Sequence, residues 1–339
     1  MKTDDLTCTG QCTKPSQSPA RALTSLALVG LLAGCAVGPD FKRPEAPTTS
    51  KYTVATMPAQ TALSTIPLGE VQTLRVGREV SSEWWHSLGS YRLDALIALA
   101  LQNSPTLASA KSTLRQAQEL HAAQAGSTRY PQVDASIGAQ RQRMSSSGLG
   151  LAGEAREFSL YNTSVGVNYR LDLAGGNRRA LEALAARVDY RSHELAGAQL
   201  TLAANITTTA IVRAKLAGQL AATKAMVEAQ DEQINVTRER VRFGQAAPDE
   251  LLAQQTQTEQ TRSGLPLLLK QLQQSEHLLA TLSGQAPGDA KVPDFTLAEF
   301  KLPTELPLVM PSDLVRRRPD IQAAEALLHA ANAEYGVAI

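Results

Sequence analysis

Aromatic residues are scarce in this sequence of 339 residues, where five Phe, seven Tyr and two Trp make up only 4% of the chain. A compact domain of this size normally uses aromatic side chains as its largest core fillers. Hydrophobic residues nevertheless reach 43%, so most of the apolar content must come from Ala and Leu. That composition is typical of long, closely packed helices.

An excess of charge of either sign is also missing. The chain has 33 Lys and Arg residues against 32 Asp and Glu residues, a formal net charge of +1. A nucleic-acid-binding protein needs a broad basic surface, and a solvating disordered tail needs an acidic one. We therefore expect no nucleic acid among the partners of this protein.

Groupings of catalytic or metal-ligating residues are missing as well. The five histidines are scattered, and none lies at a metal-ligand spacing from a second His or a Cys. The sequence has no G-x-S-x-G motif and no phosphate-binding glycine loop before a lysine. We expect a protein that is not an enzyme and that binds no metal and no cofactor.

Cysteine occurs only near the amino terminus, at positions 8, 12 and 35. The apolar run from Ala22 to Gly34 is too short to span a bilayer, which takes about 20 residues, and it suits a secretory signal peptide. The run ends in Leu-Ala-Gly-Cys, which resembles a bacterial lipobox. The resemblance implies a lipoprotein signal peptide at 1–34 and covalent lipid, including palmitate, on Cys35. Ala36 in place of Asp implies retention at the outer membrane. The alternative is an ordinary buried cysteine.

The chain after Cys35 divides by composition and periodicity. Residues 35–90 are rich in proline and predict a lipid-anchored extended arm that ends in the pair Trp84-Trp85. Residues 91–128 show apolar residues every seven positions and predict a helix, interrupted near Pro105.

The apolar period then changes to two. From Gln132 to Gln142 and again from Tyr161, apolar and polar residues alternate, which predicts two strands of about 10–12 residues, each with one apolar face and one polar face. That length suits tilted strands crossing an outer membrane. We predict a transmembrane β-hairpin at 131–172 with an external loop at 144–159, or alternatively a hairpin that lies on a soluble core. The tyrosines placed to lie at the membrane interfaces are Tyr130, Tyr161 and Tyr169. The polar residues expected to face a water-filled lumen are Asp134, Gln140, Asn168 and Arg170.

A long antiparallel helical hairpin is predicted at 175–284. No proline occurs from Gln132 to Ala247, and a single helix over 177–242 would be about 100 Å long. Heptad-spaced apolar residues continue on both sides of a turn that contains Gly244 and Pro248. Residues 285–311 predict an extended connection, and 312–339 predict a helix that begins a second repeat, because a shift of 214 residues aligns Pro105 and its apolar neighbours with Pro319 and its own.

Two strands cannot close a barrel alone, and open strand edges are not tolerated in lipid, so closure requires other chains. Four stretches resemble the outer-membrane lipoprotein factors of tripartite (RND-type) efflux pumps, the OprM/NodT branch of the TolC superfamily. They are LAGCAVGPDFKRP from Leu32, EWWHSLGSYRLDALIALALQNSPTLASA from Glu83, RFGQAAPDELLAQQ from Arg242, and LPLVMPSDLVRRRPDIQAAEALLHAANAEYGVA from Leu306.

The resemblance implies a mainly α fold with a β-hairpin: a TolC-like coiled-coil helical barrel plus transmembrane strands. It implies a homotrimer in which each chain gives four strands to a twelve-stranded barrel, so this sequence corresponds to half of a protomer, truncated after the first structural repeat. It also implies a periplasmic adaptor and an inner-membrane proton-driven transporter as partners. The adaptor-contact turn matches Arg242, Phe243, Gly244 and Asp249. The sequence departs from the family at Arg170, where an acidic residue is common, and at Ala174, where Phe is usual.

The function that these features predict is an outer-membrane exit duct, which passively passes drugs or other small molecules from the periplasm to the outside. The protein would be anchored in the outer membrane by lipid and extend into the periplasm. Two alternatives remain: a structural periplasmic coiled-coil lipoprotein without a pore, and a truncated efflux protein that does not conduct.

Overall fold

The computed structural model describes residues 38–45, 48, 53, 57–65, 69–77, 80–145, 147–150, 152, 154–308, 312 and 316–339. The predicted signal peptide and Cys35 lie outside these residues. The chain forms two compact units. The first contains the described residues up to 41 together with 126–183 and 331–339, and the second contains 42–125 and 184–330.

The first long elements are two helices, α2 (Tyr91–Asn103) and α3 (Pro105–Arg129), which belong to the second unit up to residue 125. The Ser90 hydroxyl accepts a hydrogen bond from the Leu93 amide and so caps α2. The break falls at Ser104, which is extended (φ −63°, ψ 121°) because a residue before proline is kept out of the helical region. Pro105 then starts α3, where its missing N–H costs nothing.

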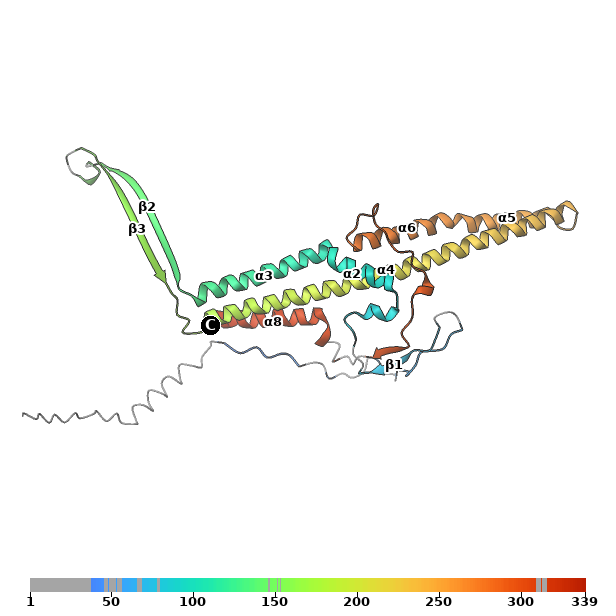
Figure 1. Cartoon of the computed structure of the whole chain (residues 1–339), viewed down its shortest axis with the longest axis horizontal. Coiled ribbons are helices and arrows are strands. Elements are labelled where there is room, and N and C mark those ends of the chain that lie inside the picture. Colours follow the sequence, from blue (N-terminus) through green and yellow to red (C-terminus); the bar gives the residue numbers. More distant parts are fainter. Residues whose placement is uncertain are drawn as a thin grey trace, which may run out of the picture. The chain divides into compact units, whose positions relative to one another are not determined.

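The longest helix, α4, runs from Gly176 to Arg242 over 67 residues. Its first turn is capped by Asp172, whose two carboxylate oxygens accept hydrogen bonds from the amides of Asn177 (3.1 Å) and Arg178 (3.0 Å). The chain returns as α5 (Pro248–Ser263) and α6 (Leu265–Leu282). In Figure 1, α5 and α6 lie beside the carboxyl-terminal part of α4. The break between them falls at Gly264, and Pro266 follows in the first turn of α6.

The core of the second unit is built from α2, α4, α6 and the segment after α6. Its fully buried members include Leu93 and Ile97 of α2, Ile206 of α4, Leu279 of α6 and Phe295. Many of the buried positions of α4 are alanines, among them Ala203, Ala210 and Ala214. Because small and branched aliphatic side chains let helices pack closely, this core needs few aromatic residues, in agreement with the composition.

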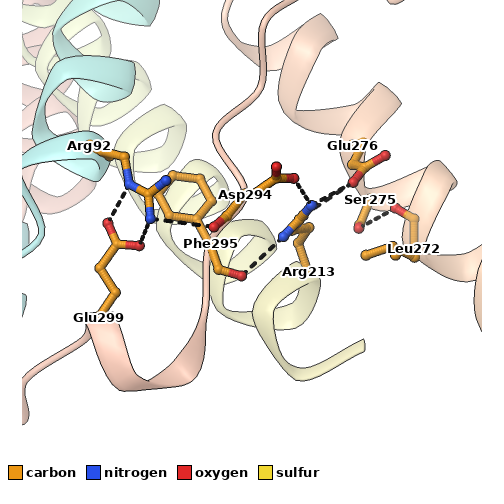
Figure 2. A network of polar contacts seen from close by, with 8 residues as sticks. All are labelled: Arg92, Arg213, Leu272, Ser275, Glu276, Asp294, Phe295 and Glu299. Carbon is orange, nitrogen blue, oxygen red and sulfur yellow. Dashed lines mark hydrogen bonds and ion pairs between the residues drawn. The ribbon is translucent and has the colours of Figure 1, made fainter. Parts of the chain in front are cut away.

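A buried arginine attaches the segment around Phe295 to the helices (Figure 2). The Arg213 side chain on α4 is only 8% exposed and forms an ion pair with Glu276 of α6 (2.9 Å). Its guanidinium also donates to the main-chain oxygen of Phe295 (3.0 Å) and contacts the Asp294 carboxylate. The helices and the segment are thereby joined through one side chain.

A second arginine holds the same segment from the other side. Arg92 of α2 donates to both carboxylate oxygens of Glu299, which also accepts a hydrogen bond from the Ser90 hydroxyl. Burial alone would raise the pKa of Glu299, but the hydrogen bonds from Arg92 and Ser90 outweigh it and lower the pKa below its usual range. Glu299 therefore stays ionised at neutral pH.

The predicted arm and the predicted connection meet in a small parallel sheet that the sequence analysis did not anticipate. Strand β1 (Thr73–Val76) pairs with β4 (Glu305–Leu308), with Thr73 opposite Glu305 and Val76 opposite Leu308. Downstream of β1, the short helix η1 (Trp84–Leu88) places Trp85 in the core, edge-to-face with Trp84 at 6.2 Å.

His86 of η1 lies between two carboxylates, with Nδ1 2.9 Å from Asp94 and Nε2 3.4 Å from Glu83. The hydrogen bond to Asp94 raises the pKa of His86. A histidine whose folded pKa is raised contributes stability that is fully present below the unfolded pKa of about 6.5 and is lost as the pH rises through the folded value.

We therefore expect the difference in melting temperature between the wild type and His86→Gln to be largest near pH 6 and to shrink toward pH 8.5. Thermal unfolding across this pH range measures it, and because His86 is half exposed the difference will be small. Asp94→Asn is the control, because without that carboxylate the difference caused by His86→Gln should depend less on pH. A difference that grows with pH would contradict the prediction.

In the first unit, the segment Gly38–Phe41 lies against the start of α4 and the end of α8 (Pro319–Ala338). Arg179 of α4 donates to the Gly38 carbonyl (3.0 Å) and to the Asp40 carboxylate (2.8 Å), and Asn332 donates to the Pro39 carbonyl (3.0 Å). Gly38 has φ +94°, and a Cβ there would lie 2.7 Å from the Cα of Gly336. Only glycine fits this crossing of two backbones.

Candidate functional site

Cys35 lies outside the described residues. The other residues proposed for function from the sequence fall on or directly after two described segments: a β-hairpin in the first unit and the turn between α4 and α5 in the second. The hairpin consists of β2 (Gln132–Met144) and β3 (Arg156–Asn168), which pair antiparallel over their full length. Figure 1 shows the two strands side by side.

The register of the hairpin gathers apolar residues on one face. Val133 lies opposite Val167, Ala135 opposite Val165, Ile137 opposite Thr163 and Ala139 opposite Tyr161. These side chains are open to solvent within the chain: Ile137 is 86% exposed and Tyr161 77% exposed. An apolar face that large and that exposed indicates a surface that is covered by another molecule or by lipid.

The opposite face carries polar residues in its first half. Asp134 lies opposite Gly166, and Ser136 lies opposite Ser164 with the two hydroxyls 2.8 Å apart. Gln132, Gln140 and Asn168 have the same parity and share this face. Three of the four residues predicted to face a lumen, Asp134, Gln140 and Asn168, therefore lie on one face of the hairpin. The fourth, Arg170, follows the last paired residue of β3, so the strand register does not assign it to a face.

The hairpin is longer at its loop end than the sequence analysis predicted. Pairing continues to Met144 opposite Arg156, so the loop is confined to the residues between these two and does not cover 144–159. The extra pairs include Arg143 opposite Glu157, and the Glu157 carboxylate lies 2.9 Å from the Arg141 guanidinium and 3.8 Å from that of Arg143. Cross-strand pairs of opposite charge stabilise such a ladder. Leu160 and Phe158 in this stretch lie on the otherwise polar face, which concealed the strand pattern.

The turn between α4 and α5 has the hydrogen bonds of a Schellman motif. The Gly244 amide donates to Val241 O (3.0 Å), the Gln245 amide donates to Arg240 O (2.7 Å), and Gly244 has φ +70°. Pro248 then begins α5, where Asp249 in the first turn is favoured by the positive end of the helix dipole.

All four predicted adaptor-contact residues lie at this turn. The turn exposes an aromatic ring. Phe243 is 65% exposed, with the Arg242 guanidinium 4.8 Å from the centre of its ring. Arg242 also contacts Glu239 (3.2 Å), and Arg240 contacts Glu250 (3.8 Å). The turn therefore presents a cation and an aromatic ring held together, a combination common at protein–protein contacts.

Two further properties of the described residues bear on function. By length and composition alone, α4 contains an 18-residue window of mean hydropathy 1.3 that could cross a membrane, with 22% of that window buried; a helix packed against other helices can have the same composition. Within the described ranges, no group of three or more His, Cys, Asp or Glu side chains is arranged to hold a metal ion.

Comparison with known sequences gives consistent matches. The family model for outer membrane efflux proteins matches residues 96–285. The pyoverdine export outer membrane protein OpmQ of Pseudomonas putida is 30% identical over 259 residues, which are 75% of this chain and 55% of that protein. The toluene efflux pump outer membrane protein TtgF, from another strain of Pseudomonas putida, is 28% identical over 93% of this chain and 63% of its own length. The chain thus spans between about half and two thirds of these relatives.

Comparison with solved structures supports the same fold. The outer-membrane channel OprN matches with a TM-score of 0.70 and 27% identity, over 90% of this chain and 64% of that one. The open state of the MtrE outer membrane channel of Neisseria gonorrhoeae matches with a TM-score of 0.68 at 24% identity, a likeness of fold. The predicted fold class, a mainly α TolC-like chain with a β-hairpin, is confirmed.

Proposed function

Because this chain belongs to the outer membrane efflux protein family, we propose that it supplies strands and helices to an outer-membrane exit duct of a tripartite efflux pump. Solutes would pass through the duct passively, from the periplasm to the outside. No side chain would perform chemistry, so selectivity would come from the width and the charge of the lumen. The protein would not be an enzyme and would need no cofactor.

The observation that carries this proposal is the two-faced hairpin. One face of β2–β3 exposes Val133, Ile137, Val165 and Tyr161, and the other carries polar residues over the same length. A soluble hairpin would cover its apolar face with protein. A strand between lipid and a water-filled lumen needs one face of each kind.

A duct of this kind requires several chains, because strand edges cannot remain open in lipid. We propose a homotrimer, in which Asp134, Gln140, Asn168 and Arg170 line the lumen. The turn formed by Arg242, Phe243, Gly244 and Asp249 would contact a periplasmic adaptor, which in turn would bind an inner-membrane proton-driven transporter. The names of OpmQ and TtgF refer to the export of pyoverdine and the efflux of toluene, so we propose small organic molecules as the solutes.

Cysteine labelling in isolated outer membranes tests whether one face of the hairpin contacts lipid and the other contacts water; we call this the two-solvent arrangement. We expect Ile137→Cys to react with a lipid-phase probe and Ser136→Cys, the neighbouring residue on the other face, to react with an aqueous maleimide. The two substitutions differ by one position, so each serves as the control for the other. Uniform aqueous labelling of both would overturn the proposal.

Conductance in planar bilayers separates the duct from its competitor, a coiled-coil lipoprotein without a pore. The competing function explains the long helices but gives no reason for a strand pair with two different faces. We expect discrete conductance steps from the purified protein. Their absence, together with uniform aqueous labelling, would favour the coiled-coil lipoprotein without a pore.

The anchor is a separate part of the proposal, since Cys35 lies outside the described residues. We expect Cys35→Ser to abolish palmitate labelling and to shift part of the protein from the membrane fraction to the soluble fraction. Several acyl chains attach a protein lastingly to a membrane, whereas a protein without acyl chains loses this attachment. Fractionation and metabolic palmitate labelling measure this, with Cys8→Ser as the control. Unchanged palmitate labelling of Cys35→Ser would show that the anchor is elsewhere.

A further inference from the structure

Two arginines interrupt the apolar face of the hairpin at its loop end. In β2, Arg141 and Arg143 have the same parity as Val133, Ala135, Ile137 and Ala139, so they lie on the apolar face and not on the polar one. Arg141 follows Ala139, whose cross-strand partner is Tyr161. The apolar residues, an aromatic ring and two cations thus follow one another along a single face.

The position of these arginines has a direct meaning in the proposed duct, on which this inference rests. Arginine on the lipid face costs about 2–4 kcal/mol at the bilayer midplane but close to nothing at the interface. The apolar face must therefore end between Ala139 and Arg141. The two guanidiniums then lie at the level of the lipid headgroups on the loop side of the membrane.

The side chains at the level of the headgroups are of the kinds that bind phosphate. The side chains of Arg141 and Arg143 are 76% and 71% exposed, and residues two apart on a strand lie about 7 Å from each other. Ser159, opposite Arg141, adds a hydroxyl. Guanidinium groups bind phosphate oxygens in bidentate fashion.

The charge of the patch stays positive although it contains one acid. Glu157 contacts both arginines and balances one of the two positive charges. At the same height the opposite face carries the uncharged residues Gln140, Gln142, Leu160 and Phe158, and a single cation, Arg156, opposite Met144. The apolar face therefore differs in having two neighbouring guanidiniums, of which one carboxylate balances only one.

We propose that Arg141 and Arg143 bind the phosphate groups of anionic lipid in the outer leaflet, and so fix the depth and tilt of the hairpin at its loop end. The contact would be continuous with the lipid-covered apolar face, which is why a lipid phosphate and not free phosphate is the expected occupant. Each cationic side chain near an anionic lipid surface adds its own contribution to the affinity of the protein for that surface.

Native mass spectrometry of the full chain in detergent tests this contact, with diphosphorylated lipid A and with lipid A lacking both phosphates as probes. We expect Arg141→Gln/Arg143→Gln to weaken retention of diphosphorylated lipid A about thirtyfold, while dephosphorylated lipid A binds the wild type and the variant alike. Glu157→Gln removes the competing carboxylate and should strengthen retention.

The matched control is Arg156→Gln, which removes one positive charge at the same height, where Arg156 lies opposite Met144 with the parity of the polar face. It should change retention by less than about twofold. If Arg156→Gln weakens retention as much as Arg141→Gln alone or Arg143→Gln alone, the effect is one of general charge and the proposal is overturned. Equal binding of both lipids to the wild type would also overturn it. Loss of lipid retention in excess inorganic phosphate would assign the patch to the free ion instead.

The outcome can be separated from that of the proposed function. The variants leave Ile137 and Ser136 intact, so the two-solvent labelling pattern should persist in them. If the wild type does not prefer diphosphorylated lipid A, while the cysteine-labelling pattern at positions 136 and 137 is as expected, only the headgroup contact is overturned. Uniform aqueous labelling overturns the duct itself.

Discussion

Ile137→Arg is expected to prevent the protein from inserting into the outer membrane. Ile137 lies in the middle of the apolar face, opposite Thr163, and is 86% exposed within the chain. An arginine on the lipid face near the bilayer midplane costs about 2–4 kcal/mol, and three copies in the proposed trimer would bring the cost to about 6–12 kcal/mol. Resistance to urea extraction of outer membranes measures insertion, and the variant protein should appear in the extracted fraction.

The matched control is Ser136→Arg, which puts the same side chain one residue away on the polar face. A lumen-facing arginine remains hydrated, so this variant should stay in the membrane like the wild type. If both variants are extracted to the same degree, the charge acts by disturbing the hairpin in general. If neither is extracted, the apolar face does not contact lipid.

The strands and the long helices could be predicted because their signals are local. Alternation from Val133 to Ala139 needs no knowledge of distant residues, and it assigned the faces of β2 as the register has them. The loop end of the hairpin was misjudged for a physical reason: Phe158 and Leu160 place apolar side chains on the polar face, so the alternation changes sense there. The signal that could have corrected the boundary was Glu157, an acid able to pair with Arg141 and Arg143.

The parallel pair β1–β4 could not be predicted in this way. Each strand has four residues, and the partners Thr73 and Glu305 lie more than two hundred residues apart in the sequence. Strands this short give no period, and parallel pairing leaves no turn signal between them. No feature local to either strand therefore specifies its partner.

The same limit applies to Arg213, which sequence analysis passed over as one arginine among many in a long helix. Its position in the heptads of α4 gives no sign that its guanidinium meets Glu276, Asp294 and the Phe295 carbonyl. Its importance becomes visible only from its burial, because a charged side chain that is 8% exposed must be fully paired. Buried charge is therefore where the structure adds most to the sequence.

Arg213→Met is accordingly expected to destabilise the second unit by about 2–4 kcal/mol. Methionine fills much of the same volume, so the loss comes from polar contacts: the Phe295 carbonyl loses its donor in the core, and Glu276 loses its cation. Urea unfolding measures the free energy, and hydrogen exchange should rise first in the segment Asp294–Phe300, which Arg213 attaches to α4 and α6.

Arg238→Met provides the control, because it is the same substitution at an exposed position of the same helix, where the arginine contacts only Asn235 among the hydrogen bonds assigned to it. Exposed substitutions of this kind stay within about 0.5 kcal/mol. Equal destabilisation by the two variants would mean that the network around Arg213 adds nothing beyond the helix itself. A large loss confined to Arg213→Met, with faster exchange at Phe295 and unchanged exchange in α5, would mean that one buried cation joins the connecting segment to the helical hairpin.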